Sequence, residues 1–166
     1  KNQEIIVAEF GAWDGIRKSN IRQFALNKCK KAIFIEPNPE RFKKLTKNYE
    51  HFDNTVTLNS YIKTAGLNSF DNLMAEISVD HLDFLSVDID GNDYHVFSSI
   101  KKILPKIVCI EFNPTIPFDS PYVQENNFLV SKGSSLISLK KLFKRKGYTF
   151  LSVVGVNAFF IKPNLV

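Results

Sequence analysis

The segment Glu9-Phe10-Gly11-Ala12-Trp13-Asp14-Gly15 is the strongest structural signal in this sequence. The apolar run Ile5-Ile6-Val7-Ala8 before it indicates a buried strand, and residues 17–28 after it have the spacing of a helix. A strand, a glycine turn and a helix in this order let the backbone approach a ligand closely, because glycine adopts conformations that other residues resist. The order predicts the first unit of an α/β sheet with a binding site at its edge.

A second strand, residues 32–36, follows this turn and ends in an acid, Glu36. Its distance from the glycine turn, about 20 residues, is the one found in nucleotide-binding units. An acid at the tip of the second strand is where the two hydroxyls of a ribose are usually held. The first two units together therefore predict a cofactor that contains a nucleoside.

Strand and helix patterns alternate along the chain. The expected strands are residues 5–10, 32–36, 55–59, 82–88, 107–111, 148–153 and 157–161. The expected helices are residues 17–28, 39–49, 70–78, 94–104 and 135–146, and Pro105 is expected to end the fourth. The alternation predicts a doubly wound α/β fold with a mostly parallel seven-stranded sheet. The short turn at Gly155 makes the last two strands an antiparallel hairpin.

Length and composition indicate one domain, residues 1–166, with a full-sized core. The net charge of +5 favours either a phosphate-rich or nucleic-acid partner or simply a solvated surface, and we expect the latter. Cys29 and Cys109 form no CxxC pair, so we expect no zinc site and two reduced thiols. No apolar run reaches the roughly 20 residues of a membrane span, and no signal pattern opens the sequence. We therefore expect a cytoplasmic protein.

Polar residues gather where the expected strands end. In an open parallel sheet, the carboxyl ends of the strands share one edge, and ligands bind beyond that edge. The polar and turn residues at or just beyond the ends of the first five strands are Glu9, Gly11, Asp14 and Gly15; Glu36, Pro37 and Asn38; Asn59 and Ser60; Asp88, Asp90, Asn92 and Asp93; and Glu111 and Asn113. Because the strand interiors are otherwise apolar, this set is the candidate functional site.

The charge of the first turn favours one kind of cofactor. The turn lacks the full Gly-x-Gly-x-x-Gly that cradles a dinucleotide pyrophosphate. Glu9 and Asp14 flank it, and carboxylates repel phosphates but suit a cationic ligand. A sulfonium cofactor with an amino-acid tail fits this chemistry better than NAD.

Three motifs carry a family resemblance: Glu9-x-Gly11-x-x-x-Gly15, Ile35-Glu36-Pro37-Asn38-Pro39-Glu40-Arg41-Phe42 and Leu85-Ser86-Val87-Asp88-Ile89-Asp90-Gly91-Asn92-Asp93-Tyr94. In this order they resemble class I S-adenosylmethionine-dependent methyltransferases, and within that class the FkbM-like branch. Residues 147–160 resemble the same branch. The resemblance covers nearly the whole chain and implies S-adenosylmethionine as cofactor and a seven-stranded sheet whose last strand is antiparallel.

The resemblance also implies roles for single residues. Glu9 and Gly11 would lie at the amino-acid part of the cofactor, Glu36 at the ribose hydroxyls, and Asp88 facing the methyl donor and the acceptor. Trp13 departs from the pattern, because many members have a glycine there. The other cofactor-binding candidates are Asp14, Gly15, Pro37, Asn59 and Ser60, the last two on the side of the adenine.

The acidic segment after the fourth expected strand supports three interpretations. Asp88 and Asp90 would share a strand face, and Glu111 and Asn113 repeat that spacing on the next strand, so four oxygens could converge on Mg²⁺ or Mn²⁺. Without a metal, Asp88 or Asp90 would be the general base for an acceptor hydroxyl. Alternatively, residues 90–93 only turn the chain and cap the following helix.

The leading functional hypothesis is an O-methyltransferase that acts on a small molecule or on a sugar or glycan precursor, the sugar being implied by the resemblance alone. His95, in the first turn of the fourth helix, is a further catalytic candidate. The long segment 114–133 is expected to cover the acceptor. A non-catalytic Rossmann-like module of a larger protein and a nucleic-acid methyltransferase remain alternatives. The basic residues of helix 135–146 are expected to form a solvated face, so nucleic acid is not an expected partner.

Overall fold

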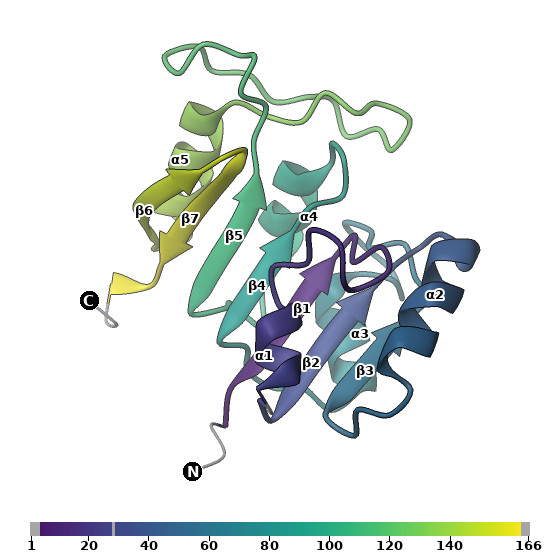
Figure 1. Cartoon of the computed structure of the whole chain (residues 1–166). Coiled ribbons are helices and arrows are strands. Elements are labelled where there is room, and N and C mark those ends of the chain that lie inside the picture. The colour runs from purple at the N-terminus through teal and green to yellow at the C-terminus, as the bar shows by residue number, and fades with distance from the viewer. Residues whose placement is uncertain (1–3, 28, 164–166) are drawn as a thin grey trace.

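A computed structural model describes residues 4–27 and 29–163 (Figure 1). The predicted domain limits at residues 1 and 166, and the predicted end of the first helix at residue 28, lie outside the described residues. The strands are β1 (Ile6–Phe10), β2 (Lys31–Ile35), β3 (Thr55–Leu58), β4 (Phe84–Val87), β5 (Ile107–Glu111), β6 (Thr149–Val154) and β7 (Asn157–Ile161). The helices are α1 (Arg22–Leu26), α2 (Pro39–Tyr49), α3 (Phe70–Glu76), α4 (Asp93–Ser99) and α5 (Leu136–Arg145).

The strands form one seven-stranded sheet in the order β3-β2-β1-β4-β5-β7-β6. Strands β1 to β5 pair in parallel, and β7 pairs antiparallel with both β5 and β6. This confirms the predicted parallel sheet with an antiparallel hairpin at its C-terminal end. It also makes β4 and β5 neighbours, as the metal interpretation requires.

Helices cover both faces of the sheet, so the fold is doubly wound as predicted. One apolar cluster joins α3, α4 and α5 to one face, and a second joins α1 and α2 to the other. Adjacent strand residues alternate between the two clusters: Val7 packs with α1 and α2, whereas Ala8 packs with the opposite helices. Strands β1, β2, β4 and β5 are therefore buried on both sides, which is why they are apolar runs, whereas β6 at the edge of the sheet is mostly exposed.

The first helix is much shorter than the sequence predicts. The spacing predicts a helix over residues 17–28, but α1 spans only Arg22–Leu26. The preceding residues are held in turns by two carboxylates: Glu9 accepts a hydrogen bond from the Asn20 amide, eleven residues away, and Asp14 accepts one from the Arg17 amide, three residues away. These contacts replace the helical hydrogen bonds that the local spacing favours.

The fourth helix also ends early, and Pro105 does not end it. Helix α4 stops at Ser99, and the next residue, Ile100, has an extended backbone. The Asp71 carboxylate, from α3, accepts hydrogen bonds from the amides of Lys101 and Lys102. That contact fixes the chain in a non-helical course several residues before the proline.

At Gly11, the backbone of the turn after β1 lies against the backbone of the turn after β4. Gly11 has a φ of +70°, and a Cβ atom added to it would lie 1.8 Å from the carbonyl oxygen of Asp88. Only glycine permits this approach of two backbone segments. Gly66 provides a comparison, because it has a φ of +80° but no other atom lies within 4 Å of the position that a Cβ atom would take there.

We expect Gly66→Ala to lower the free energy of unfolding by ~1–2 kcal/mol, the cost of a left-handed backbone with a Cβ atom. Gly11→Ala should cost a further ~1–3 kcal/mol, because the two turns must move apart. Urea denaturation of the two variants measures the difference. Equal losses would show that the contact between the turns is unimportant for stability.

Candidate functional site

A cavity of about 590 Å³ lies at the carboxyl ends of β1, β2 and β4. This is the edge at which open α/β sheets bind ligands, and the volume suits a small molecule. The cavity is lined by Glu9, Gly11, Ala12, Trp13, Arg17, Lys18, Ser19, Ile35, Glu36, Pro37, Arg41, Ser60, Tyr61, Ile62, Asp88, Ile89, Asp90 and Phe128. Seven of the residues predicted for the site line this one cavity: Glu9, Gly11, Glu36, Pro37, Ser60, Asp88 and Asp90.

Glu9 is buried at the end of β1 and organises the loop above it. Its carboxylate accepts hydrogen bonds of 2.6 Å from the Ser19 hydroxyl and from the Asn20 amide. Burial raises the pKa of Glu9 to about 7, although these hydrogen bonds oppose the shift. The predicted cofactor residue therefore also fixes the course of the chain at residues 19 and 20.

Asp14 and Gly15 are not among the residues that line the cavity. The Asp14 carboxylate accepts hydrogen bonds from the amides of Ile16 and Arg17. Gly15 has a φ of +71°, and a Cβ atom there would overlap the side chains of Leu45 and Tyr49 on α2. The structure gives these two candidates roles in shaping the turn.

Glu36 is buried at the end of β2 and lines the cavity. Its two carboxylate oxygens accept hydrogen bonds from the amides of Trp13, at 2.8 Å, and Asn38, at 2.9 Å. Trp13, the residue that departs from the family pattern, has a φ of +55°. The Arg41 guanidinium lies over the Trp13 ring, 4.8 Å from its centroid, and both residues line the cavity.

The two residues predicted near an adenine differ in position. Ser60 lines the cavity together with Tyr61 and Ile62. Asn59 is not among the lining residues, and its side-chain amide donates hydrogen bonds to the carbonyls of Glu36 and Pro37. Asn59 thus fixes the end of β2 from the neighbouring strand.

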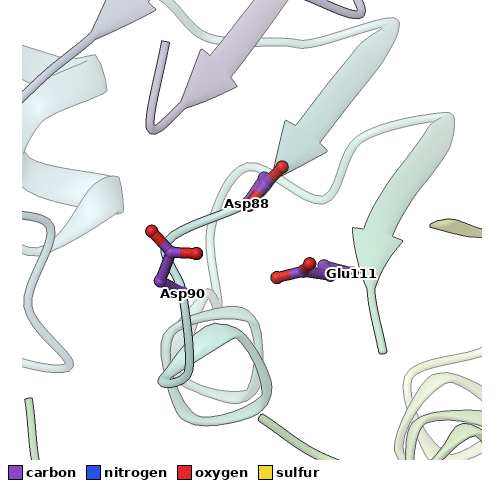
Figure 2. A group of neighbouring side chains, drawn as sticks. All are labelled: Asp88, Asp90 and Glu111. Carbon is purple, nitrogen blue, oxygen red and sulfur yellow. The ribbon is translucent and has the colours of Figure 1, made fainter. Parts of the chain in front are cut away.

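Three carboxylates lie close together beyond the ends of β4 and β5 (Figure 2), and two of them, Asp88 and Asp90, line the cavity. Asp88 follows β4, Asp90 lies on the next turn with a φ of +55°, and Glu111 ends β5. Each offers an oxygen atom within 4.8 Å of the other two. Burial, with a smaller effect of Asp88, raises the pKa of Glu111 to about 7. Burial and the charge of Asp90 also raise the pKa of Asp88.

The structure separates the remaining candidates from this cluster. Asn113 directs its amide to the carbonyl of Lys132 and its oxygen to Thr115, so it is not brought together with the three acids. His95 donates a hydrogen bond from Nε2 to the carbonyl of Gln124, 2.7 Å away, and is not among the lining residues. His95 thus contacts the long loop.

Asp93 forms part of the turn, which is the role that one interpretation of the sequence gave to all of residues 90–93. It is buried, and its carboxylate accepts hydrogen bonds from the amides of Ile89 and Gly91. Burial raises its pKa to about 6. Asp93 therefore closes the turn, which leaves Asp88 and Asp90 facing the cavity.

Two features of the site were not predicted from the sequence. Gln124 is buried, donates a hydrogen bond to Oδ1 of Asn92 and accepts one from the Gly133 amide, which anchors the 114–133 segment. The same segment supplies Phe128 to the cavity. The length of the segment and its aromatic residues, Phe128 among them, were the available signal, but nothing in the sequence marked Gln124.

Asn157, the first residue of β7, is the second unpredicted feature. It pairs directly with Glu111 across the antiparallel ladder, so the two side chains share one face of the sheet. Its Oδ1 atom is buried without a hydrogen-bond partner among the described residues. The family resemblance of residues 147–160 includes Asn157 but gives it no role, because its position opposite Glu111 depends on the pairing of β7 with β5.

The sheet order and the cavity define a class I methyltransferase fold, and solved structures share it. A S-adenosylmethionine-dependent methyltransferase from Aquifex aeolicus has 13% identity and a TM-score of 0.56, with 96% of this chain and 81% of that chain covered. TYW2 of M. jannaschii, solved with AdoMet, has 14% identity and a TM-score of 0.56, with 97% and 71% covered. TrmK of M. capricolum, solved with S-adenosylhomocysteine, has 17% identity and a TM-score of 0.54, with 96% and 62% covered.

Residues 54–150, more than half of the chain, match the family of the methyltransferase FkbM domain, and the chain belongs to this family. This confirms the predicted class of S-adenosylmethionine-dependent methyltransferases and the FkbM-like branch. No curated protein sequence matches the chain. None of the helices in residues 4–27 and 29–163 is long and apolar enough to cross a membrane.

The raised pKa of Glu9 predicts how stability depends on pH. The folded protein holds this proton up to a pKa of about 7, whereas the ordinary value is 4.5. Between these values the folded state binds more protons than the unfolded state, so the free energy of unfolding falls as pH rises. We expect Glu9→Gln to make this fall shallower, as measured by urea denaturation from pH 4.5 to 7.5. Glu40→Gln, which changes an exposed carboxyl on α2, should retain the slope of the unchanged protein.

Proposed function

We propose that this protein transfers the methyl group of S-adenosylmethionine to a hydroxyl oxygen of a small molecule or of a sugar or glycan precursor. The observation that carries the proposal is the cavity, which has a buried carboxylate, Glu36, at the end of β2 and two carboxylates, Asp88 and Asp90, after β4, with Glu111 of β5 close to both. The first suits a nucleoside, and the acids after β4 suit a hydroxyl that must lose its proton.

The lining residues fit the cofactor. Glu36 accepts one hydrogen bond at each carboxylate oxygen and retains lone pairs for the hydroxyls of a ribose. Ser60 and Ile62 offer a polar group and an apolar surface beside it, where we place the adenine. When bound, the cofactor supplies an electrophilic methyl group on a positively charged sulfur, and the acids at the end of β4 favour that charge.

The acidic cluster would accept the proton of the acceptor hydroxyl. We assign the role of general base to Asp88, because it lines the cavity and its pKa is raised. Base catalysis is most effective when the pKa of the base lies near the working pH. The oxygens of Asp88, Asp90 and Glu111 could instead hold Mg²⁺ or Mn²⁺, which would orient the hydroxyl and lower its pKa.

We expect the purified protein to bind S-adenosylhomocysteine in calorimetric titration and not to bind NAD. Glu36→Gln should weaken that affinity by about tenfold or more, because a buried charged acceptor of the ribose is lost. Glu40→Gln, on the exposed side of α2, should bind as the unchanged protein does. Thermal melting of both variants separates lost affinity from lost folding. No binding of the sulfur nucleoside by the unchanged protein would favour the non-catalytic module.

If Asp88 is the general base, its substitution should slow methyl transfer without weakening the binding of the cofactor. Asp88→Asn should slow methyl transfer by about 10²–10⁴-fold and leave the affinity for S-adenosylhomocysteine unchanged. The measurement is release of S-adenosylhomocysteine from S-adenosylmethionine in a screen of sugar and phenol acceptors, with added Mg²⁺ or with EDTA. Activity that survives EDTA favours the metal-free base, and unchanged turnover of Asp88→Asn would exclude the assignment.

A further inference from the structure

Three cationic side chains line the cavity: Arg17, Lys18 and Arg41. None of them lies within 4.0 Å of a carboxylate in the part of the chain that the structure describes. Arg41 stacks on Trp13, whereas no aromatic ring lies under Arg17 or Lys18 among the described residues. Arg17 and Lys18 therefore present charges beside the cavity that no ion pair among the described residues holds.

The loop that carries Arg17 and Lys18 is held from both ends. Asp14 accepts the amide hydrogen of Arg17, at 2.8 Å, and Glu9 accepts that of Asn20, at 2.6 Å. The Ser19 hydroxyl donates a second hydrogen bond to Glu9. The two cations thus stand on a segment whose position is fixed before any ligand arrives.

Lys18 is held in an uncommon conformation. Its φ is +58°, in the left-handed region that lysine rarely adopts. Such a conformation costs free energy and persists only where the surroundings impose it, often at binding sites. Its ammonium is also close enough to Asp88 to oppose the rise in the pKa of that carboxyl. Lys18 and Asp88 thus line the same cavity, and the charge of Lys18 acts on it.

We propose that Arg17 and Lys18 form an anion subsite at the cavity, which takes a carboxylate or phosphate group of a bound ligand. An arginine and a lysine side by side combine a two-pronged donor with a compact positive charge, which suits either group. The subsite rests on the proposed function, and two ligands could supply the anion. One is the α-carboxylate of the cofactor, and the other is an acidic group on the acceptor.

The test is calorimetric titration of the full chain carrying Arg17→Gln and Lys18→Asn. Asparagine tolerates the left-handed backbone at position 18, so the loop should keep its course. The control is Lys43→Met, which removes an exposed charge on α2 outside the lining residues. Each protein is titrated with S-adenosylhomocysteine and with its decarboxylated analogue, S-adenosyl-3-thiopropylamine.

If the subsite holds the cofactor carboxylate, the double variant should bind S-adenosylhomocysteine about tenfold to a hundredfold more weakly and the decarboxylated analogue as the unchanged protein does. If it holds an acidic acceptor, cofactor affinity should not change. Inorganic phosphate or D-glucuronate should then bind the S-adenosylhomocysteine complex of the unchanged protein, D-glucose should not, and the double variant should lose this binding.

Equal affinities of the double variant and the unchanged protein for S-adenosylhomocysteine, phosphate and glucuronate would overturn the subsite while leaving the proposed function intact. Failure of the unchanged protein to bind S-adenosylhomocysteine would instead overturn the proposed function. Phosphate binding that depends on Arg17 and Lys18 would still support the subsite in that case, and its absence would remove both proposals.

Discussion

The site depends on the contact between Gly11 and the carbonyl of Asp88. It brings the turn after β1 against the turn after β4, at a distance that no side chain larger than hydrogen allows. One turn leads to the loop that Glu9 holds, and the other carries the acidic cluster. Because the contact is between backbones, it places the two halves of the cavity relative to each other independently of any ligand.

Three buried carboxylates also hold the loops around the cavity, each by accepting hydrogen bonds from backbone amides. Glu9 accepts from the amide of Asn20, Glu36 accepts from those of Trp13 and Asn38, and Asp93 accepts from those of Ile89 and Gly91. Burying a charged group is costly, and the raised pKa values of Glu9 and Asp93 show that cost. The hydrogen bonds to backbone amides offset it and give a rigid rim to loops that have little regular structure.

Much of the fold could be predicted from sequence, because buried parallel strands are continuous apolar runs and their order follows from the family resemblance. The candidate site was predicted less completely. Residues 17–21 have helical spacing, but the contact with Glu9 spans eleven residues and prevails over it. Asn113 was placed by spacing alone, whereas Asn157 lies opposite Glu111 only through strand pairing. Contacts between residues far apart in sequence leave no local pattern.

The pKa values of the carboxyl groups at the ends of β4 and β5 depend on the charge of the ligand that is bound beside them. Burial and the charge of Asp90 raise the pKa of Asp88, and burial together with the charge of Asp88 raises the pKa of Glu111. A positive charge brought close to them lowers those pKa values, and its removal raises them again. Under the proposed reaction, the ligand is cationic before transfer and its sulfur is neutral afterwards. The carboxyls would therefore be ionised when a proton must be accepted and would retain the proton once the methyl group has moved.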